Sequence, residues 1–256
     1  MDFATIAGVA IAFIAIFASM ILEGGNPMAI FLIPPLLLVF VGTIGAGLAG
    51  GLLSDAMRAG KALVLAFTAK PTSAAGTVDT VVRLAERARR EGLLALESDI
   101  KAVEDQFLRD GLQSAVDGAD PEELREILYG RIDTKRAADK QAAKFFTDMG
   151  GYAPTIGIIG TVIGLIHVLE NLSEPEKLGH LIAGAFVATL WGVLSANVLW
   201  LPIASRLKRL SEVECQQMEV ALEGVLAIQS GTSPRVVAER LTSLLPPGTM
   251  PEQKAA

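Results

Sequence analysis

The hydroxyl groups of Thr161 and Thr189 are the groups in this sequence with the clearest potential for chemistry. They lie in two apolar stretches, Gly150–Leu169 and His180–Pro202, which have no carboxylate, lysine or arginine in their middle. Matched hydroxyls on neighbouring helices supply oxygen ligands to a hard cation or to its water. The alternative is that each hydroxyl bonds back to its own helix backbone. Because neither stretch has a carboxylate or an amine to carry an ion, we expect a second protein to supply one.

The same stretches contain prolines and regularly spaced small residues. Pro154 and Pro202 lie at the ends that we assign to the cytoplasmic side, where a proline either terminates a helix or frees a carbonyl and acts as a hinge. Small residues recur every three or four positions, which lets helix backbones approach closely in lipid. These residues are Gly157, Gly160, Gly164, Gly184, Ala188, Gly192 and Ala196.

Other chemistry finds little support in this sequence. There is no phosphate-binding loop, zinc-ligand helix or catalytic motif, so we expect neither an enzyme nor a bound cofactor or metal. The two histidines, His167 and His180, fall at the outer ends of their stretches, and a proton-relay role stays open only for His167. The single cysteine, Cys215, is read as an inert thiol. A net charge of −6 argues against nucleic acid as a partner.

A cluster of both charge signs lies in the polar middle of the chain. It is either a solvated helix face or a docking face for a protein, in which charge sets specificity and encounter rate. Its members are Arg83, Glu86, Arg87, Arg89, Arg90, Glu91, Glu97 and Asp99.

The elements that must position these groups are four apolar spans and two polar segments. The 256 residues are 51% hydrophobic and have a mean hydropathy of +0.46, values typical of a polytopic membrane protein. The expected spans are Ala4–Leu22, Ala29–Leu53, Gly151–Leu169 and Leu181–Pro202. We therefore divide the chain into a transmembrane hairpin (1–53), a cytoplasmic helical domain (54–148), a second hairpin (149–205) and a cytoplasmic tail (206–256).

The placement of lysine and arginine predicts the orientation. Lys177 is the only basic residue in the two short loops, whereas the central segment has 15 and the tail has 6 of the 22. Both termini are therefore expected in the cytoplasm and the short loops outside. Asp2 stands where a signal peptide would be positive, so the first span is read as an uncleaved helix.

Local signals predict an all-α fold, because alternating strand patterns are absent. Gly92 is placed to end one cytoplasmic helix. Asp120 with Pro121, and Ser233 with Pro234, are typical helix starts. The pair Pro34–Pro35 inside the second span predicts a kink there.

The chain resembles the MotA/PomA family of flagellar stator subunits. The segments that carry the resemblance are ARREGLLALE (Ala88–Glu97), GGYAPTIGIIGTVIGLI (Gly150–Ile166), ATLWGVLSANVLWLPIA (Ala188–Ala204) and EGVLAIQSGTSPRVV (Glu223–Val237). They occur in the family's order and cover nearly the whole chain, while the N-terminal hairpin matches mainly in pattern.

The resemblance implies an A subunit in the inner membrane, five of which surround two MotB-type subunits. The MotB-type helix supplies the essential aspartate, and ion flux drives torque on the rotor protein FliG. In the family, a basic residue and a glutamate eight apart on the cytoplasmic helix engage FliG. These correspond to Arg89 and Glu97, with Arg90 as a second basic candidate. The family's functional prolines correspond to Pro154 and Pro202, and its ion-handling threonines to Thr161 and Thr189.

The transported ion and two other functions stay open. The threonine pair favours sodium, but proton stators are commoner and threonines also occur in them, so we favour the proton. An ExbB/TolQ-type energiser is the alternative within transport. It usually has three spans and an external N-terminus, whereas the charges here predict four spans and internal termini. A membrane scaffold without ion flux is the alternative from another class.

Overall fold

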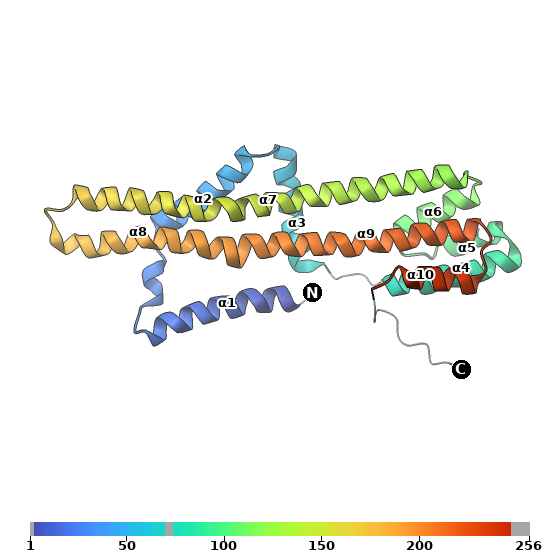
Figure 1. Cartoon of the computed structure of the whole chain (residues 1–256), viewed down its shortest axis with the longest axis horizontal. Helices are drawn as coiled ribbons and strands as arrows, with labels where there is room; N and C mark the ends of the chain where they lie inside the picture. Colours follow the sequence, from blue (N-terminus) through green and yellow to red (C-terminus); the bar gives the residue numbers. More distant parts are fainter. Residues whose placement is uncertain (1–2, 70–73, 247–256) are drawn as a thin grey trace. The chain divides into compact units, whose positions relative to one another are not determined.

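The computed structural model describes residues 3–69 and 74–246, and every regular element among them is helical, as expected (Figure 1). The α-helices are α1 (Phe3–Leu22), α2 (Ile33–Ala49), α3 (Leu53–Thr68), α4 (Ala74–Glu91), α5 (Glu97–Ile100), α6 (Gln106–Val116), α7 (Pro121–Glu170), α8 (Pro175–Ser195), α9 (Leu201–Gln229) and α10 (Pro234–Ser243). Three short turns complete the list: the 3-10 turns η1 (Pro27–Ile30) and η2 (Leu93–Leu96), and the π turn η3 (Ala196–Trp200).

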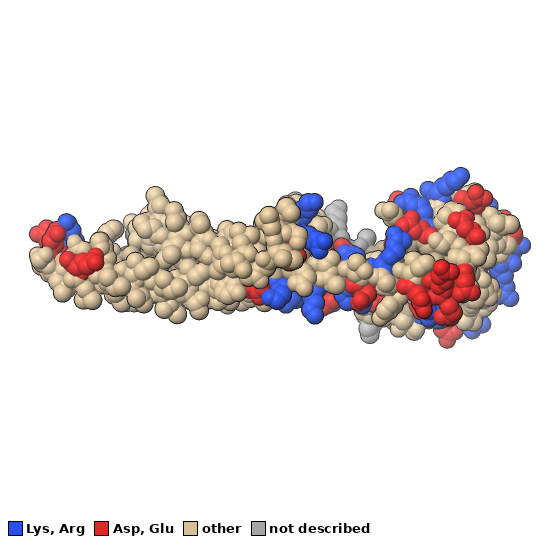
Figure 2. Space-filling model, turned by 90° about the horizontal axis from the view of Figure 1, so that it is seen from above, with Lys and Arg blue, Asp and Glu red and all other residues tan. Residues whose placement is uncertain are grey.

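The chain forms two compact units, each built from two separate stretches of sequence. Unit 1 contains residues 3–69 and 139–210, and unit 2 contains residues 74–138 and 211–246. These divisions differ from the four ranges expected from the sequence, because α3 and residues 139–148 pack with the apolar helices. Figure 2 shows a mainly uncharged surface over the apolar helices and a dense mixture of both signs elsewhere.

Among residues 3–69 and 74–246, three helices are long and apolar enough to cross a membrane. They are α1, α7 and the continuous helix Pro175–Gln229, whose most apolar windows have mean hydropathies of 2.5, 1.8 and 1.8. The fourth apolar helix, α2, has 17 residues and is shorter than the span expected at Ala29–Leu53. Because α2 begins only after η1, the first residues of the expected span are not part of the long helix.

The prediction of a kink at Pro34–Pro35 was wrong. Both prolines lie in the first turn of α2, where the backbone N–H groups have no intrahelical partner to lose. A fixed φ near −65° also suits a helix start. The two prolines therefore begin this helix instead of bending it.

Of the two alternatives for Pro154 and Pro202, the helix terminator is excluded. Pro154 lies inside α7, which runs unbroken for 50 residues. Pro202 follows the π turn η3, in which the Leu201 N–H reaches back five residues to the Ala196 carbonyl. A proline removes one backbone bond, but both helices continue through it.

Helices α7 and α8 approach each other closely along their small residues, as the spacing predicted. At Gly157 a Cβ atom would lie 2.8 Å from the Ala188 carbonyl oxygen, and at Gly192 it would lie 2.6 Å from the Ala153 carbonyl oxygen. Gly160 and Gly164 face α8 in the same way: a Cβ on either would lie 2.6 Å from the Cβ of Ala188 or Ala185, respectively. Only glycine permits backbones this near to each other.

Aromatic side chains connect the remaining helices of unit 1. Trp191 of α8 is buried, and its indole N–H donates a 2.7 Å hydrogen bond to the carbonyl oxygen of Ile30. Phe31 and Phe40 lie against its ring with centroids 5.5 and 5.9 Å away. Phe17 of α1 stacks on Phe31 at 6.0 Å, so α1, α2 and α8 share one aromatic row.

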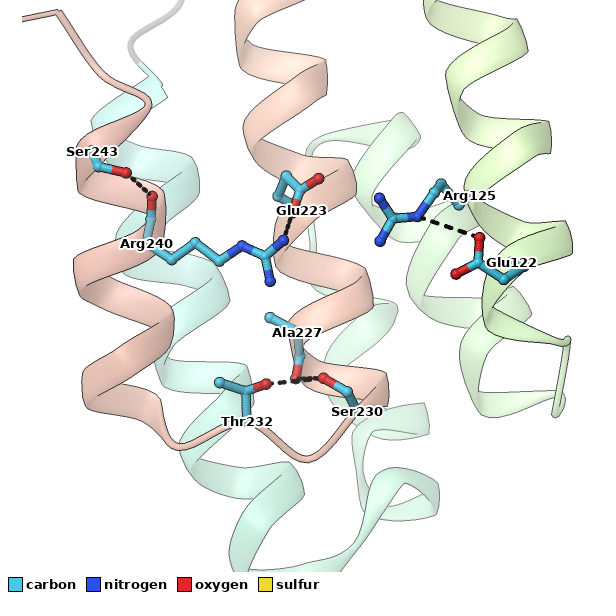
Figure 3. A network of polar contacts seen from close by, with 8 residues as sticks. All are labelled: Glu122, Arg125, Glu223, Ala227, Ser230, Thr232, Arg240 and Ser243. Atoms are coloured by element: carbon cyan, nitrogen blue, oxygen red, sulfur yellow. Dashed lines mark hydrogen bonds and ion pairs between the residues drawn. The ribbon is translucent and has the colours of Figure 1, made fainter.

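Unit 2 has its own apolar core, formed by α4, α6, α10 and the parts of α7 and α9 within it. The predicted helix start at Asp120 is confirmed, because its side chain accepts hydrogen bonds from the Glu122 and Glu123 N–H groups. Helix α10 starts at Pro234, also as predicted. Figure 3 shows how Arg240 of α10 pairs with Glu223 of α9, while Ser230 and Thr232 bond to each other in the connecting turn.

Gly192→Ala is expected to force α7 and α8 apart, because the new Cβ would collide with the Ala153 carbonyl oxygen. We expect a destabilisation of about 1–3 kcal/mol, measured as a lower unfolding midpoint of the purified protein in detergent. Gly184→Ala in the same helix is the control, since its Cβ would meet only Leu32 Cδ1 at an ordinary 3.6 Å. Equal losses at both positions would contradict the close packing.

Candidate functional site

The close approach of α7 and α8 brings the two predicted threonine hydroxyls together. The distance between Thr161 Oγ1 and Thr189 Oγ1 is 2.5 Å. Thr161 Oγ1 also lies 2.9 Å from the Ala185 carbonyl oxygen, across the helix pair. Both hydroxyls lie 3.3 Å from the Gly157 carbonyl oxygen. Hydroxyls and carbonyls from two helices therefore form one cluster of oxygen atoms.

The hydrogen bonds of this cluster leave acceptor capacity unused. Each hydroxyl has one proton and two lone pairs, so Thr161 can donate to Ala185 while Thr189 donates to Thr161 or to Gly157. Lone pairs on both oxygens then remain free for water or a cation. Thr161 also contacts the Gly157 carbonyl of its own helix, as expected if the hydroxyl bonds back to its backbone. The pair therefore has a contact within the helix and still has free acceptors. Both side chains are partly exposed in this chain.

No carboxylate, lysine or arginine lies in the apolar stretches that hold the pair. Within residues 149–169 and 181–205 the sequence has no Asp, Glu, Lys or Arg. His167 lies six residues beyond Thr161, or about 9 Å along the helix, where it is 60% exposed and contacts Glu170 at 3.3 Å. The described residues contain no group of three His, Cys, Asp or Glu side chains suited to a metal ion.

Helix α3 packs against α7 and α9 near Pro154 and Pro202. This contact was not predicted from the sequence. Helix α3 buries Ala59 and Ala66 in a cluster with Met149 of α7 and Ile203 of α9. Met149 is five residues before Pro154, and Ile203 is directly after Pro202. In the sequence, the signal for this contact was the seven-residue spacing of Ala59 and Ala66. That spacing alone does not show which helices they contact.

The candidate rotor residues lie on either side of a sharp turn and not on one helix, which corrects the expectation. Arg89 and Arg90 belong to the last turn of α4, whereas Glu97 is the first residue of α5. Between them Gly92 has a φ of +88°, a conformation that other residues rarely adopt. Gly92 ends α4 as predicted.

The charges at this turn are of two kinds. Arg89, Arg90 and Glu97 are exposed and have no ion-pair partner among residues 74–246. Arg87, by contrast, contacts two carboxylates: its Nε lies 3.2 Å from Glu91 Oε2 and its Nη1 lies 2.5 Å from Asp99 Oδ1. The hydrogen bond to Asp99, followed by that to Glu91, raises the pKa of Arg87 above its ordinary value. The sequence identified this cluster but not which of its members were free.

An exposed apolar side chain accompanies the free charges. Leu94 of η2, between Arg90 and Glu97 in sequence, is 75% exposed, while Leu96 in the same turn is fully buried. The surface at the turn therefore presents both signs of charge and one large apolar side chain. Such a mixture is typical of protein-docking surfaces.

Comparison with known proteins gives consistent results along the chain. The profile of the MotA/TolQ/ExbB proton channel family matches residues 99–220. Motility protein A of Bacillus subtilis (strain 168) is 37% identical in an alignment 266 residues long, gaps included. The alignment covers 96% of this chain and 92% of that protein. Motility protein A of Treponema phagedenis is 35% identical over 255 residues, covering 100% of this chain and 98% of the relative.

Among solved structures, two examples are similar over nearly the whole chain. One is the structure of C. jejuni MotAB, with a TM-score of 0.93, 29% identity and coverage of 98% of this chain and 100% of that chain. The other is the flagellar MotAB stator complex from Bacillus subtilis, with a TM-score of 0.89, 36% identity and 96% coverage of each.

These relatives favour a stator subunit over an ExbB/TolQ-type energiser, because full-length matches have the name motility protein A. The apolar helices and the family agree on a membrane location. With more than 30% identity to relatives over nearly all of its length, the chain belongs to the motility protein A (MotA) family of flagellar stator subunits.

Proposed function

We propose that this chain, with a MotB-type partner, forms an ion-conducting stator that converts ion flux into torque on the rotor protein FliG. One observation in the chain supports this most directly. Two hydroxyls with free lone pairs meet between helices whose apolar stretches contain no Asp, Glu, Lys or Arg. Such a site binds a passing ion or its water but does not carry a proton by itself, so an acid from a partner has to complete it.

The partner's aspartate is proposed to face Thr161 and Thr189. Large apolar side chains next to the pair on α7 are more than half exposed in this chain, among them Ile159, Val162 and Ile163. An apolar surface of this kind suits contact with lipid and with an apolar partner helix. We favour the proton as the transported ion, with sodium as the alternative.

The assembly follows the family pattern. We propose five copies of this chain around two partner subunits in the inner membrane. Each copy would cross the bilayer four times, through α1, α2, the apolar part of α7 and the helix of α8. Both termini then lie in the cytoplasm, because the lysines and arginines gather outside the two short loops.

Pro154 and Pro202 are proposed to couple ion binding to movement. Each lies inside a continuous helix and removes one backbone bond. The π turn before Pro202 is a local change in helix winding, and such turns occur frequently at functional sites. A small shift in winding there would bend or rotate the helix without breaking it. The contact of α3 beside both prolines would transmit that shift.

The rotor contact is proposed to be the turn that presents Arg89, Arg90 and Glu97. Their charges are exposed and unpaired in the part of the chain that is described, so no internal ion pair has to break when a partner binds. Complementary charges on FliG would then set the register and the encounter rate.

Replacing the two threonines by valine tests the ion site, because valine keeps the shape and removes the hydroxyl. For Thr161→Val and Thr189→Val we expect ion flux through the purified complex in liposomes to fall about fivefold per hydroxyl, the equivalent of about 1 kcal/mol. Thr155→Val is the control, since that exposed hydroxyl bonds only to the Tyr152 carbonyl of its own helix. Normal flux in all three variants would remove the hydroxyls from the ion path.

The choice of ion is tested by swimming speed. A proton-driven stator should swim at the same speed as external sodium is varied and should stop when a protonophore is added. A speed that rises with sodium and survives the protonophore would instead identify a sodium stator.

Reversing the rotor charges tests the docking face. In Arg89→Glu with Glu97→Arg, each exposed charge exchanges an attraction of about 0.5 kcal/mol for a similar repulsion, so rotor engagement should weaken about tenfold or more. Stator complexes should still form, as measured by purification with the partner. The control reverses Arg235 and Glu239, two exposed charges of α10 without an ion pair among the described residues. Loss of assembly would show instead that Arg89 and Glu97 are structural.

A further inference from the structure

Arg87 joins the two sides of the turn that presents the free charges. It lies on α4, two residues before Arg89, and its guanidinium reaches Glu91 on the same helix and Asp99 on α5. Asp99 is two residues after Glu97. A single side chain therefore links the helix that presents the basic residues to the helix that presents the acid.

Helix α5 depends on such a link because it is very short. It has four residues, far fewer than a helix needs to be stable by itself. Leu96 and Ile100 anchor it from inside, with 0% and 1% of their surfaces exposed. On the outer side, Asp99 pairs with Arg87 of α4. The buried residues set the depth of α5, and the Arg87–Asp99 pair restrains its rotation about them.

The chain between the two helices offers only limited restraint. Gly92 bonds its N–H to the Ala88 carbonyl at 2.8 Å, and its own carbonyl accepts from Ala95 at 3.2 Å. The turn thus has local hydrogen bonds of its own, but Gly92 is the residue with the greatest backbone freedom in it. A contact across the turn reduces that freedom.

We propose that Arg87 is a positioning residue for rotor binding: it holds α5 against α4 so that Glu97 is presented together with Arg89 and Arg90. The inference rests on the proposed rotor contact of those three residues. Arg87 differs from them because its charge is already shared by two carboxylates. The choice of arginine also follows from the geometry, since a guanidinium fork serves two carboxylates at once and a lysine ammonium is a single point of charge.

The small energy of the Arg87–Asp99 pair distinguishes a role in positioning α5 from a role in stabilising the folded unit. The side chains of Arg87 and Asp99 are 38% and 33% exposed, and exposed ion pairs contribute little to the free energy of unfolding. Loss of the pair should therefore leave the folded unit intact. The same small energy is enough to change the population of the presented arrangement about two- to fivefold.

The first experiment measures the arrangement itself. Spin labels on Glu86→Cys and Ser98→Cys, two exposed positions on the two sides of the turn, report their separation in the full stator complex with Cys215→Ala as background. Arg87→Gln is expected to broaden the distance distribution. Arg83→Gln is the control, because Arg83 is an exposed arginine of α4 without an ion pair in the described chain. An unchanged distribution in Arg87→Gln overturns the inference, whatever the rotor contact proves to be.

The second experiment measures the consequence. In Arg87→Gln the number of stators engaged at motors should fall about two- to fivefold, with complex yield, unfolding midpoint and ion flux unchanged. Arg87→Lys should restore engagement only in part. The exchange Arg87→Asp with Asp99→Arg should restore most of it, because the guanidinium at position 99 can again span the turn.

The outcomes distinguish the two proposals. Failure of the exchanged pair to restore engagement would mean that Arg87 touches the rotor directly, and the positioning role would be wrong. A lower yield or midpoint in Arg87→Gln would make the pair structural. A broadened distance distribution with normal engagement would show that the turn does not bind the rotor as proposed, which overturns the rotor contact and this role together.

Discussion

The backbone contact between α7 and α8 is the constraint on which the candidate ion site depends. At Gly157 and Gly192 the two helices are so near that neither position has room for a Cβ atom. This distance lets a threonine hydroxyl on one helix reach both the hydroxyl and a carbonyl of the other. In lipid, where apolar side chains gain nothing by leaving the solvent, close backbone contact is itself a main source of attraction between helices.

Pro154 and Pro202 lie inside continuous helices, so their role differs from that of helix terminators. A proline that ends a helix isolates what comes before it, whereas a proline inside a continuous helix allows strain to pass through. Both Pro154 and Pro202 are of the second kind, and the π turn before Pro202 shows where the winding has already changed. The contact of α3 with α7 and α9 places a third helix beside both sites.

The turn between α4 and α5 has charges of two kinds: some are free to meet a partner, and others are already held in ion pairs. Arg89, Arg90 and Glu97 are exposed and free of internal pairs within the described residues, while Arg87 is occupied by Glu91 and Asp99. Composition alone makes all of them equivalent members of one cluster. An arginine that is paired with a carboxylate on each side of a turn is suited to holding the two sides together. An unpaired arginine is suited to binding a partner protein.

Local chemistry was enough to predict the helical class, the apolar stretches, the end of α4 at Gly92 and the starts of α7 and α10. Each of these depends on residues within a few positions of one another, through capping, backbone conformation or periodicity. The tertiary structure alone decided that Pro34 and Pro35 begin a helix, that Pro154 and Pro202 interrupt none, and that Thr161 meets Thr189. It also decided which charges stay free. Those outcomes depend on contacts between residues far apart in the sequence, whose energies no local pattern contains.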